Sequence, residues 1–217
     1  MPPFTQVINM LAALFLLVAF AMLSQRRIVN LINLYAIQGL ILALSISVVA
    51  YGTHQNHLYW SAALNGLLKV CVVPVLLHRL VRTLKVAWDP ESLVRIPTVM
   101  LLGLALVIFA FHVSLPIAGL ARTVNHDTLG VALASIFLSF LMMILRTTAI
   151  SQVIGFLALE NGLIFAATSV TYGMPMVIEL GIALDVIVGV LIFGVFSFHI
   201  RAQFDSLDLR HMERRDE

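Results

Sequence analysis

Three ionisable residues of this chain lie deep inside apolar segments. Glu160, Asp185 and Lys69 are each flanked by long runs of Leu, Val, Ile, Ala and Phe. An ionised group at the centre of a bilayer costs about 2.5–3.5 kcal/mol on insertion scales, so such groups normally face a bundle interior or a water-filled path. Two carboxyl groups withdrawn from bulk water can exchange protons near neutral pH, and a neighbouring lysine can decide when they do.

These residues allow two interpretations. One is a proton relay through Glu160 and Asp185, with Lys69 as the counter-charge. The other is a buried ion pair or hydrogen bond that fixes helix register and moves no proton. Whether Lys69 is a relay member or a structural partner stays open. Further polar residues could line the same path: Gln38, His112, Glu179 and Asn161.

Two of these lining candidates have simpler explanations. His112 is also typical of a packed or water-bonded histidine. Glu179 lies near the start of an apolar segment, so its carboxylate could reach the surface. The sequence shows neither a cluster of metal-ligand residues nor a cofactor-binding motif, so we expect no metal and no cofactor.

Composition places this chemistry in a lipid bilayer. Of the 217 residues, 61% are hydrophobic and 11% are charged, whereas a soluble domain averages about 25% charged residues. A soluble fold of this length could not bury so much apolar surface, so an integral membrane protein is predicted. The net charge of +2 does not indicate nucleic-acid binding. The basic residues are better explained as topology signals.

The apolar segments predict an all-α polytopic membrane protein with about seven transmembrane helices. A span needs about 20 apolar residues. Segments of this kind lie at approximately 4–24, 29–51, 58–80, 97–119, 127–146, 150–172 and 174–199. They do not alternate apolar with polar residues, so helices fit better than barrel strands. We expect a transmembrane domain over 1–200 and a cytoplasmic tail over 201–217. The start of the chain has no basic region and no evident cleavage site, and is interpreted as a span.

The basic residues predict the orientation. All but two of the 13 Lys and Arg residues fall on one side of the seven-span topology. The exceptions are Arg122, on the opposite side, and Lys69, within a span. Cytoplasmic loops are enriched in Lys and Arg, so the N-terminus is expected outside and the C-terminus in the cytoplasm.

The polar residues also align in an internal repeat. The matching segments are 64–77 with 180–193, and 35–41 with 157–164. In these alignments Lys69 falls opposite Asp185, and Gln38 falls opposite Glu160. At 1.5 Å per residue, each lies roughly 14–17 Å from a helix end, near the bilayer midplane. The few polar positions thus coincide, which identity between apolar runs alone would not require.

The repeat predicts a duplicated architecture. Residues of about 4–82 and 127–200 would be copies of one three-helix unit, joined by a connector helix over 97–119. A single connecting span returns the chain to its starting side, so the copies would be parallel in the membrane. Because the first copy has Gln38 and Lys69 where the second has carboxylates, the copies would have diverged in role.

A proline in the third segment lies close to the lysine. Pro74 removes a backbone hydrogen bond five residues after Lys69 and is expected to disturb the helix. A local opening there could bring water to the lysine, and a simple packing kink is the alternative.

Cys71, the only cysteine, can form no disulfide within the chain and is expected to be a small buried hydrophobic residue.

Several short motifs together resemble a known family. They are "IGFLALENGLIF" at 154–165, "ELGIALDVIVGVLIFGVFSFHIRAQFDSLDLRHM" at 179–212, "LYAIQGLIL" at 34–42 and "KVCVVPVLL" at 69–77. With these motifs the chain resembles the hydrogenase-4 component E family, small membrane subunits of group 4 respiratory-type hydrogenases. Its C-terminal half is also similar to the K subunit of respiratory complex I and to the corresponding subunit of cation/proton antiporters. The resemblance covers nearly the whole chain.

The resemblance implies specific roles. By position, Glu160 and Asp185 correspond to the two buried acidic residues of the family's proton channel. Complex I usually has a glutamate at the second place, so the aspartate here reaches about one methylene less far. The resemblance further implies a non-catalytic subunit of an oxidoreductase complex, with no redox centre of its own. It would sit among larger antiporter-like subunits in a bacterial or archaeal cytoplasmic membrane.

Two rival functions remain at this stage. The chain could be a structural scaffold of the same assembly that moves no proton. It could also be a stand-alone small ion transporter, although the sequence shows no pair of broken helices of the kind that forms such substrate sites.

Overall fold

The structure is a computed structural model that describes residues 3–53, 56–84, 95–120, 126–171, 180–191 and 194. The regular elements in these ranges are α1 (Pro3–Ser24), α2 (Ile28–Thr53), α3 (Asn56–Gly66), the π-helical η1 (Leu67–Val72), α4 (Val73–Leu84), α5 (Ile96–Leu120), α6 (His126–Leu145) and α7 (Ala149–Thr171). A short apolar helix, Leu180–Leu191, follows. The predicted all-α fold class is confirmed.

The described helices are those of a multi-pass membrane protein. Six helical segments are long and apolar enough to cross a membrane. They are Gln6–Ser24, Ile28–Gly52, Leu58–Leu84, Ile96–Pro116, Asp127–Leu145 and Ala149–Thr168. They match the first six predicted spans, and the third consists of α3, η1 and α4 together. Of the predicted seventh span, Leu180–Leu191 and residue 194 are described, while the tail 201–217 lies outside the described residues.

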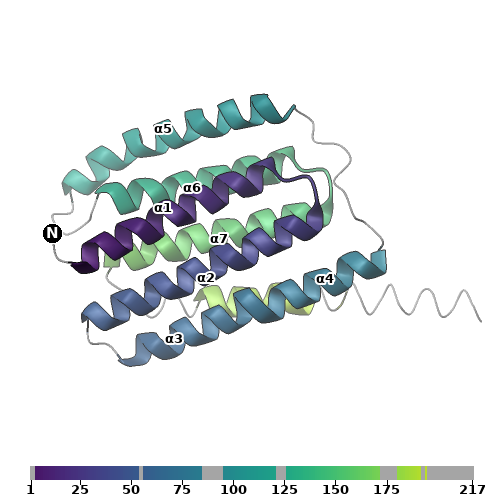
Figure 1. The fold of residues 1–217 in the computed structure, drawn as a ribbon, viewed down its shortest axis with the longest axis horizontal. Coiled ribbons are helices and arrows are strands. Elements are labelled where there is room, and N and C mark those ends of the chain that lie inside the picture. The colour runs from purple at the N-terminus through teal and green to yellow at the C-terminus, as the bar shows by residue number, and fades with distance from the viewer. Residues whose placement is uncertain are drawn as a thin grey trace, which may run out of the picture.

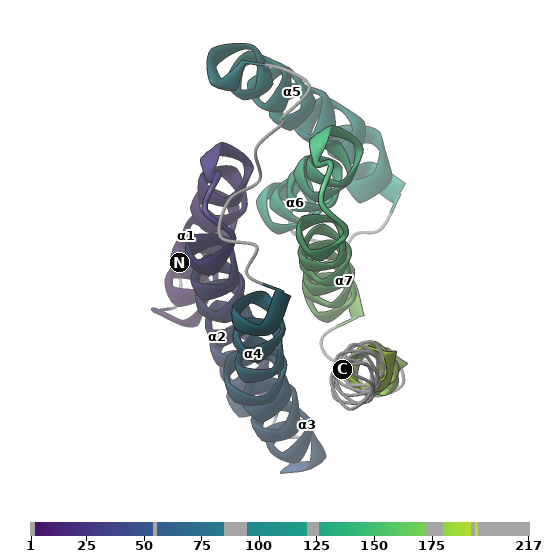
Figure 2. The ribbon, with the colours of Figure 1, turned by 90° about the vertical axis from the view of Figure 1, so that its right-hand side faces the viewer.

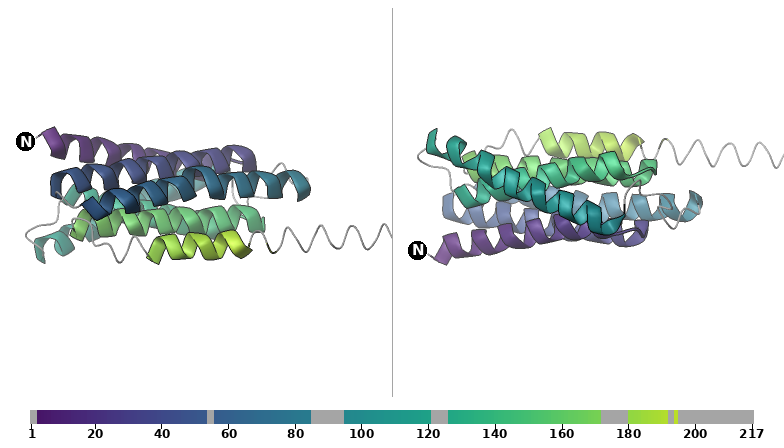
Figure 3. Two further views of the ribbon diagram at one scale, coloured as in Figure 1. Left: turned by 90° about the horizontal axis from the view of Figure 1, so that it is seen from below. Right: turned by 90° about the horizontal axis from the view of Figure 1, so that it is seen from above.

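The helices lie side by side in two rows. Viewed from one end (Figure 2), α1, α2 and α3–η1–α4 form a first row, while α6, α7 and Leu180–Leu191 form a second. Between the rows α1 packs on α6 and α2 on α7, and α5 covers the outside of α6. Figure 1 and Figure 3 show that the helix axes run roughly along one common direction. The rows contain the two predicted repeat copies, and α5 is the predicted connector. The duplication itself stays a prediction.

Aromatic packing joins the two rows of helices. The rings of Phe15 in α1 and Phe165 in α7 stack with their centroids 4.8 Å apart. Both side chains are almost fully buried. Since lipid tails are as apolar as these side chains, close packing rather than exclusion of water holds such helices together.

A buried arginine joins the rows at one end of the bundle. Arg146 follows α6, and its guanidinium donates hydrogen bonds to the carbonyls of Met22 at 3.3 Å, Leu23 at 3.4 Å and Gln25. The last carbonyls of a helix have no partner within it, and a cation there also interacts favourably with the helix dipole. Arg146 therefore caps the C-terminal end of α1, beyond the role of a topology signal that the sequence assigns it.

The third span departs from α-helical geometry at Lys69. Residues Leu67–Val72 form η1, and the Val73 N–H donates to the carbonyl of Leu68, five residues back. Pro74 has no N–H to donate, and its ring crowds the carbonyl four residues earlier. A wider π-helical turn relieves that conflict, and such turns are frequent at functional sites. The disturbance expected from Pro74 thus takes the form of η1.

The prediction for Cys71 is wrong. Its side chain is exposed, on the same outward stripe of the third span as Leu67 and Val75, which are four residues away on either side. A spanning helix is apolar both where it meets lipid and where it meets other helices. The apolar run around Cys71 therefore did not reveal which way the thiol faces.

Candidate functional site

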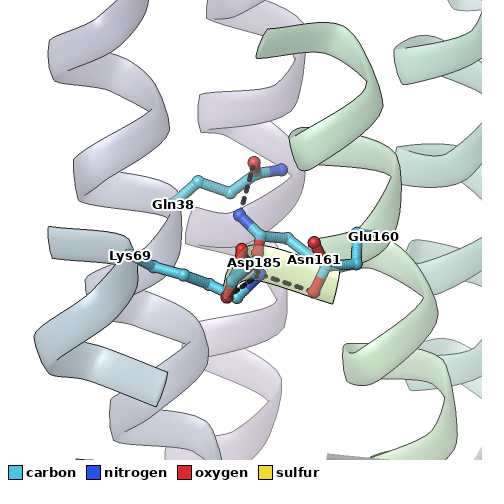
Figure 4. A network of polar contacts seen from close by, with 5 residues as sticks. All are labelled: Gln38, Lys69, Glu160, Asn161 and Asp185. Carbon is cyan, nitrogen blue, oxygen red and sulfur yellow. Dashed lines mark hydrogen bonds and ion pairs between the residues drawn. The ribbon is translucent and has the colours of Figure 1, made fainter. Parts of the chain in front are cut away.

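One ammonium group lies between two buried carboxylates where the two rows of helices meet (Figure 4). The Nζ atom of Lys69 lies 2.9 Å from Oε1 of Glu160, and 3.1 Å and 3.0 Å from the two carboxylate oxygens of Asp185. Lys69 comes from η1 in the first row, Glu160 from α7 and Asp185 from Leu180–Leu191 in the second. The structure thus brings together the three ionisable residues that the sequence singled out.

This cluster, which we call the ionic triad, is closed off from the surface. The exposed fraction is 0% for Lys69, 6% for Glu160 and 1% for Asp185. With all three groups ionised, the triad carries one net negative charge, and with one proton on either carboxyl group it is neutral. A net charge is costly in a low-dielectric interior. The negatively charged state of the triad therefore needs a further hydrogen-bond donor or cation, whereas the neutral state does not.

An amide pair lies next to the triad and also crosses between the rows. The Nδ2 of Asn161 donates to the Oε1 of Gln38 at 3.3 Å, and both side chains are fully buried. Asn161 follows Glu160 in α7, while Gln38 is in α2, so the pair positions α2 beside the triad (Figure 4). Both residues were predicted as lining residues, and both lie at the site.

A glycine lets the lysine enter this cluster. A Cβ atom built on Gly39 would lie 2.8 Å from the Cβ of Lys69, closer than real Cβ contacts allow. The backbone of α2 therefore meets η1 at a position where any larger residue would push them apart. The sequence analysis did not identify Gly39, although its place directly after Gln38 was a usable signal.

Two further buried polar residues were also missed. The Tyr35 hydroxyl and both amide atoms of Asn65 are buried and have no hydrogen-bond partner within the described part of the chain. Tyr35 precedes Gln38 by three residues and Asn65 precedes Lys69 by four, spacings that place each pair on one helix face. Tyr35 also lies within electrostatic reach of the two carboxylates. Helical spacing from the known polar residues could have found both.

Several buried polar atoms of the site have no hydrogen-bond partner among the described residues. Among the described residues, Nε2 of Gln38, Oε2 of Glu160 and Oδ1 of Asn161 are buried and lack a hydrogen bond. Leaving a buried polar group unpaired costs about 1–3 kcal/mol. Such groups in proteins nearly always bind other protein groups or ordered water. The site is therefore suited to contacts with water or with a neighbouring polypeptide.

Two predicted lining residues remain, His112 and Glu179. His112 is exposed on α5 and is not part of the cluster. Glu179 lies outside the described residues. Within the ranges that the structure describes, no group of three or more His, Cys, Asp or Glu side chains is placed to hold a metal ion. Between the two buried carboxylates the charge partner is the Lys69 ammonium.

Comparison with known proteins identifies relatives over most of the chain. It is 33% identical to "uncharacterized protein Rv0085" of Mycobacterium tuberculosis over 151 residues, 69% of each chain. It is 23% identical over 209 residues, 96% of each chain, to hydrogenase-4 component E of Escherichia coli strain K12 and of Shigella flexneri. No family model and no solved structure matches. Hydrogenase-4 component E is thus a homologue, while the likeness to the complex I K subunit stays a prediction.

Proposed function

The chain belongs to the same family as the protein Rv0085 and is a homologue of hydrogenase-4 component E, and from this we propose that it is a membrane subunit of a hydrogenase-4-like respiratory assembly. In that assembly Glu160 and Asp185 pass protons along the middle of the bilayer. Lys69 biases their charge state. The observation that carries the proposal is the ionic triad, in which one ammonium contacts two buried carboxylates from different helices.

The triad supports proton movement because its charge can be balanced in two equivalent ways. When Glu160 holds the proton, the ammonium pairs with the carboxylate of Asp185. When Asp185 holds it, the ammonium pairs with Glu160. The Nζ–O distances of 2.9 Å and 3.0 Å allow the lysine to serve either partner with little displacement. A proton can therefore move from one carboxyl group to the other while the buried cluster stays neutral, and its later release leaves one negative charge until the next proton arrives.

The unpaired polar atoms suggest where protons enter and leave. Oε2 of Glu160 and the free atoms of the Gln38–Asn161 pair are buried without a partner in the described part of the chain. In the assembly these atoms bind water or polar groups of larger antiporter-like subunits. Redox chemistry in other subunits then drives proton movement through this path. The same proposal includes the kinship with complex I, the bacterial or archaeal cytoplasmic membrane, and an outside N-terminus with a cytoplasmic C-terminus.

The proposal can be tested by neutralising each carboxyl group in the intact assembly. Glu160→Gln and Asp185→Asn remove the titratable proton and keep the side-chain shape. We expect each variant to assemble, as judged by native gels of solubilised membranes, and to lose at least about tenfold in proton translocation into inverted vesicles. The matched control is Asp127→Asn, which makes the same change in the first turn of α6, away from the triad. Normal assembly with unchanged translocation in both test variants would contradict the relay.

A structural scaffold is the second candidate, because the triad itself joins the two rows of helices. Buried ion pairs can often be replaced by apolar groups without loss of stability. A triple variant Lys69→Met, Glu160→Leu and Asp185→Leu tests this. A scaffold would assemble and support full translocation with the apolar triad, whereas a relay would assemble and translocate nothing. Purification of the chain as a lone monomer from native membranes would instead favour a stand-alone transporter.

A further inference from the structure

An apolar groove runs along the bundle between α1 and α5, far from the ionic triad. Its volume is about 520 Å³, and it is broadly open on its outer side. The lining side chains are Ala13, Leu16, Leu17, Phe20, Ala21, Met100, Leu104 and Val107. Each of them is hydrophobic, so the groove offers a long apolar surface lined by no polar side chain.

The groove exists because α5 touches α1 at one level and diverges elsewhere. A Cβ on Gly103 would lie 2.8 Å from Cδ2 of Leu23 and 3.3 Å from Cε2 of Phe20, so the two helices are in close contact there. On α1, Ala13 and Ala21 lie eight residues apart on one face, and their small side chains leave the floor of the groove low. Close contact beside small residues therefore produces a furrow rather than a filled interface.

One end of the groove is positively charged. A small adjoining hollow between α1, α5 and α6 is lined by Ser24, Arg26, Ile96 and Arg146, among others. Arg26 lies two residues after the end of α1, and Arg95 directly precedes α5, so both mark this end. The side chains of Arg26 and Arg95 are exposed. The carboxylates of the described residues, Asp127, Glu160 and Asp185, belong to α6, α7 and Leu180–Leu191, and none lines the groove or the hollow.

We propose that this groove binds one anionic phospholipid, with an acyl chain along α1 and α5 and the phosphate at Arg26 and Arg95. The apolar length suits the hydrocarbon chain, and two arginines at its end suit a phosphate. Basic pockets between transmembrane helices are typical sites for anionic headgroups. A zwitterionic lipid would gain the same apolar contacts but less from the arginines.

The headgroup can be tested by native mass spectrometry of the purified full-length chain. The delipidated protein is titrated with phosphatidylglycerol or with phosphatidylcholine of the same acyl chains. We expect one phosphatidylglycerol to bind preferentially. The double variant Arg26→Gln, Arg95→Gln should weaken its binding roughly tenfold or more, since each basic residue near the surface contributes to attraction. The control Arg79→Gln, Arg82→Gln removes the same charge from exposed residues of α4 and should leave binding unchanged.

The acyl-chain part is tested by filling the groove. Ala13→Phe with Ala21→Phe places large side chains on its floor, and we expect the single bound phosphatidylglycerol to be lost. Ala105→Phe is the control, because Ala105 is exposed on α5 and does not line the groove. Circular dichroism and gel filtration confirm that the variants are folded. Retained binding in a folded groove-filled variant would overturn the site.

Other results would also overturn the proposal. Equal binding of phosphatidylcholine would show that no headgroup site exists. An equal loss in the α4 control would show that only the overall surface charge matters. In the intact assembly, a Leu17→Cys variant made with Cys71→Ser tests for a protein occupant. Efficient cross-linking of position 17 to another subunit would show that a polypeptide, not a lipid, fills the groove.

Discussion

The two rows of helices contribute different chemistry to one site. The first row supplies a cation, Lys69, and an amide, Gln38, while the second supplies both carboxylates and the amide of Asn161. Each of these polar contacts crosses from one row to the other. The buried polar groups of each row therefore depend on partners from the other row. The site is therefore a property of the interface, and separation of the rows would abolish it.

Removing the cation of the first row, Lys69, is expected to have the largest effect on the stability of the bundle. Lys69→Met leaves two carboxylates buried without their counter-charge. Losing one partner of a buried pair costs about 3–5 kcal/mol, so we expect a large drop in thermal stability in detergent micelles. The triple variant Lys69→Met, Glu160→Gln, Asp185→Asn removes both anions as well and should regain most of the loss. A stable single variant would show that the rows do not depend on this charge pairing.

A second bridge between the rows can be broken at the end of the bundle. Arg146→Gln withdraws the guanidinium from the carbonyls at the end of α1. Hydrogen bonds to charged groups contribute about 1.5–3 kcal/mol, and we expect a loss of this size in chemical denaturation. Arg82→Gln on the exposed surface of α4 should change stability by less than about 0.5 kcal/mol. Equal effects of the two changes would reduce Arg146 to a topology signal.

Helix packing can be probed with matched glycine substitutions, one at a contact within the first row and one at a contact between the rows. Gly39→Ala in the first row places a methyl group 2.8 Å from the Cβ of Lys69, whereas Gly189→Ala in the second meets Leu76 at an ordinary 3.8 Å. Overpacking typically costs about 1–3 kcal/mol. We therefore expect a clear loss of stability for Gly39→Ala and almost none for Gly189→Ala, measured by the melting temperature of each variant. The reverse order would mean that α2 and η1 can separate without cost.

The smallest effect concerns the amide pair. Gln38→Leu removes the hydrogen bond to Asn161 while keeping the apolar volume. Side-chain hydrogen bonds within membrane proteins average about 0.6 kcal/mol, so only a slight loss of stability is expected. Double-mutant cycles with Asn161→Leu would measure the coupling directly. A coupling near zero would limit the amides to a role other than holding the rows together.

Much of this architecture followed from the sequence because lipid imposes simple rules. Long apolar runs gave the six described spans, and the cost of charge in hydrocarbon singled out Glu160, Asp185 and Lys69. Both rules act on single segments, so neither predicts which way a side chain turns. Cys71 was expected inside and faces outward, and His112 was a lining candidate but lies exposed on α5.

The parts that sequence reasoning missed depend on contacts between segments. Gly39 matters because Lys69 lies opposite it, and Arg146 matters because α1 ends beside it. Tyr35 and Asn65 are single polar residues in apolar runs, and only their helical spacing from Gln38 and Lys69 hinted at a shared face. Local hydropathy does not predict contacts between distant segments, so these contacts could be identified only from the three-dimensional structure.

The π-helical turn η1 has a consequence for the third span as a whole. Because each turn of a π-helix holds more residues than an α-helical turn, α3 and α4 are out of angular phase with each other. The faces of α3 that carry Asn65 and of α4 that carry Leu77 are thus set independently. Deleting one residue within Leu67–Val72 would restore α-helical phase and rotate one half of the span by about 100° relative to the other. The turn acts as a phase offset that lets the two ends of one helix meet different neighbours.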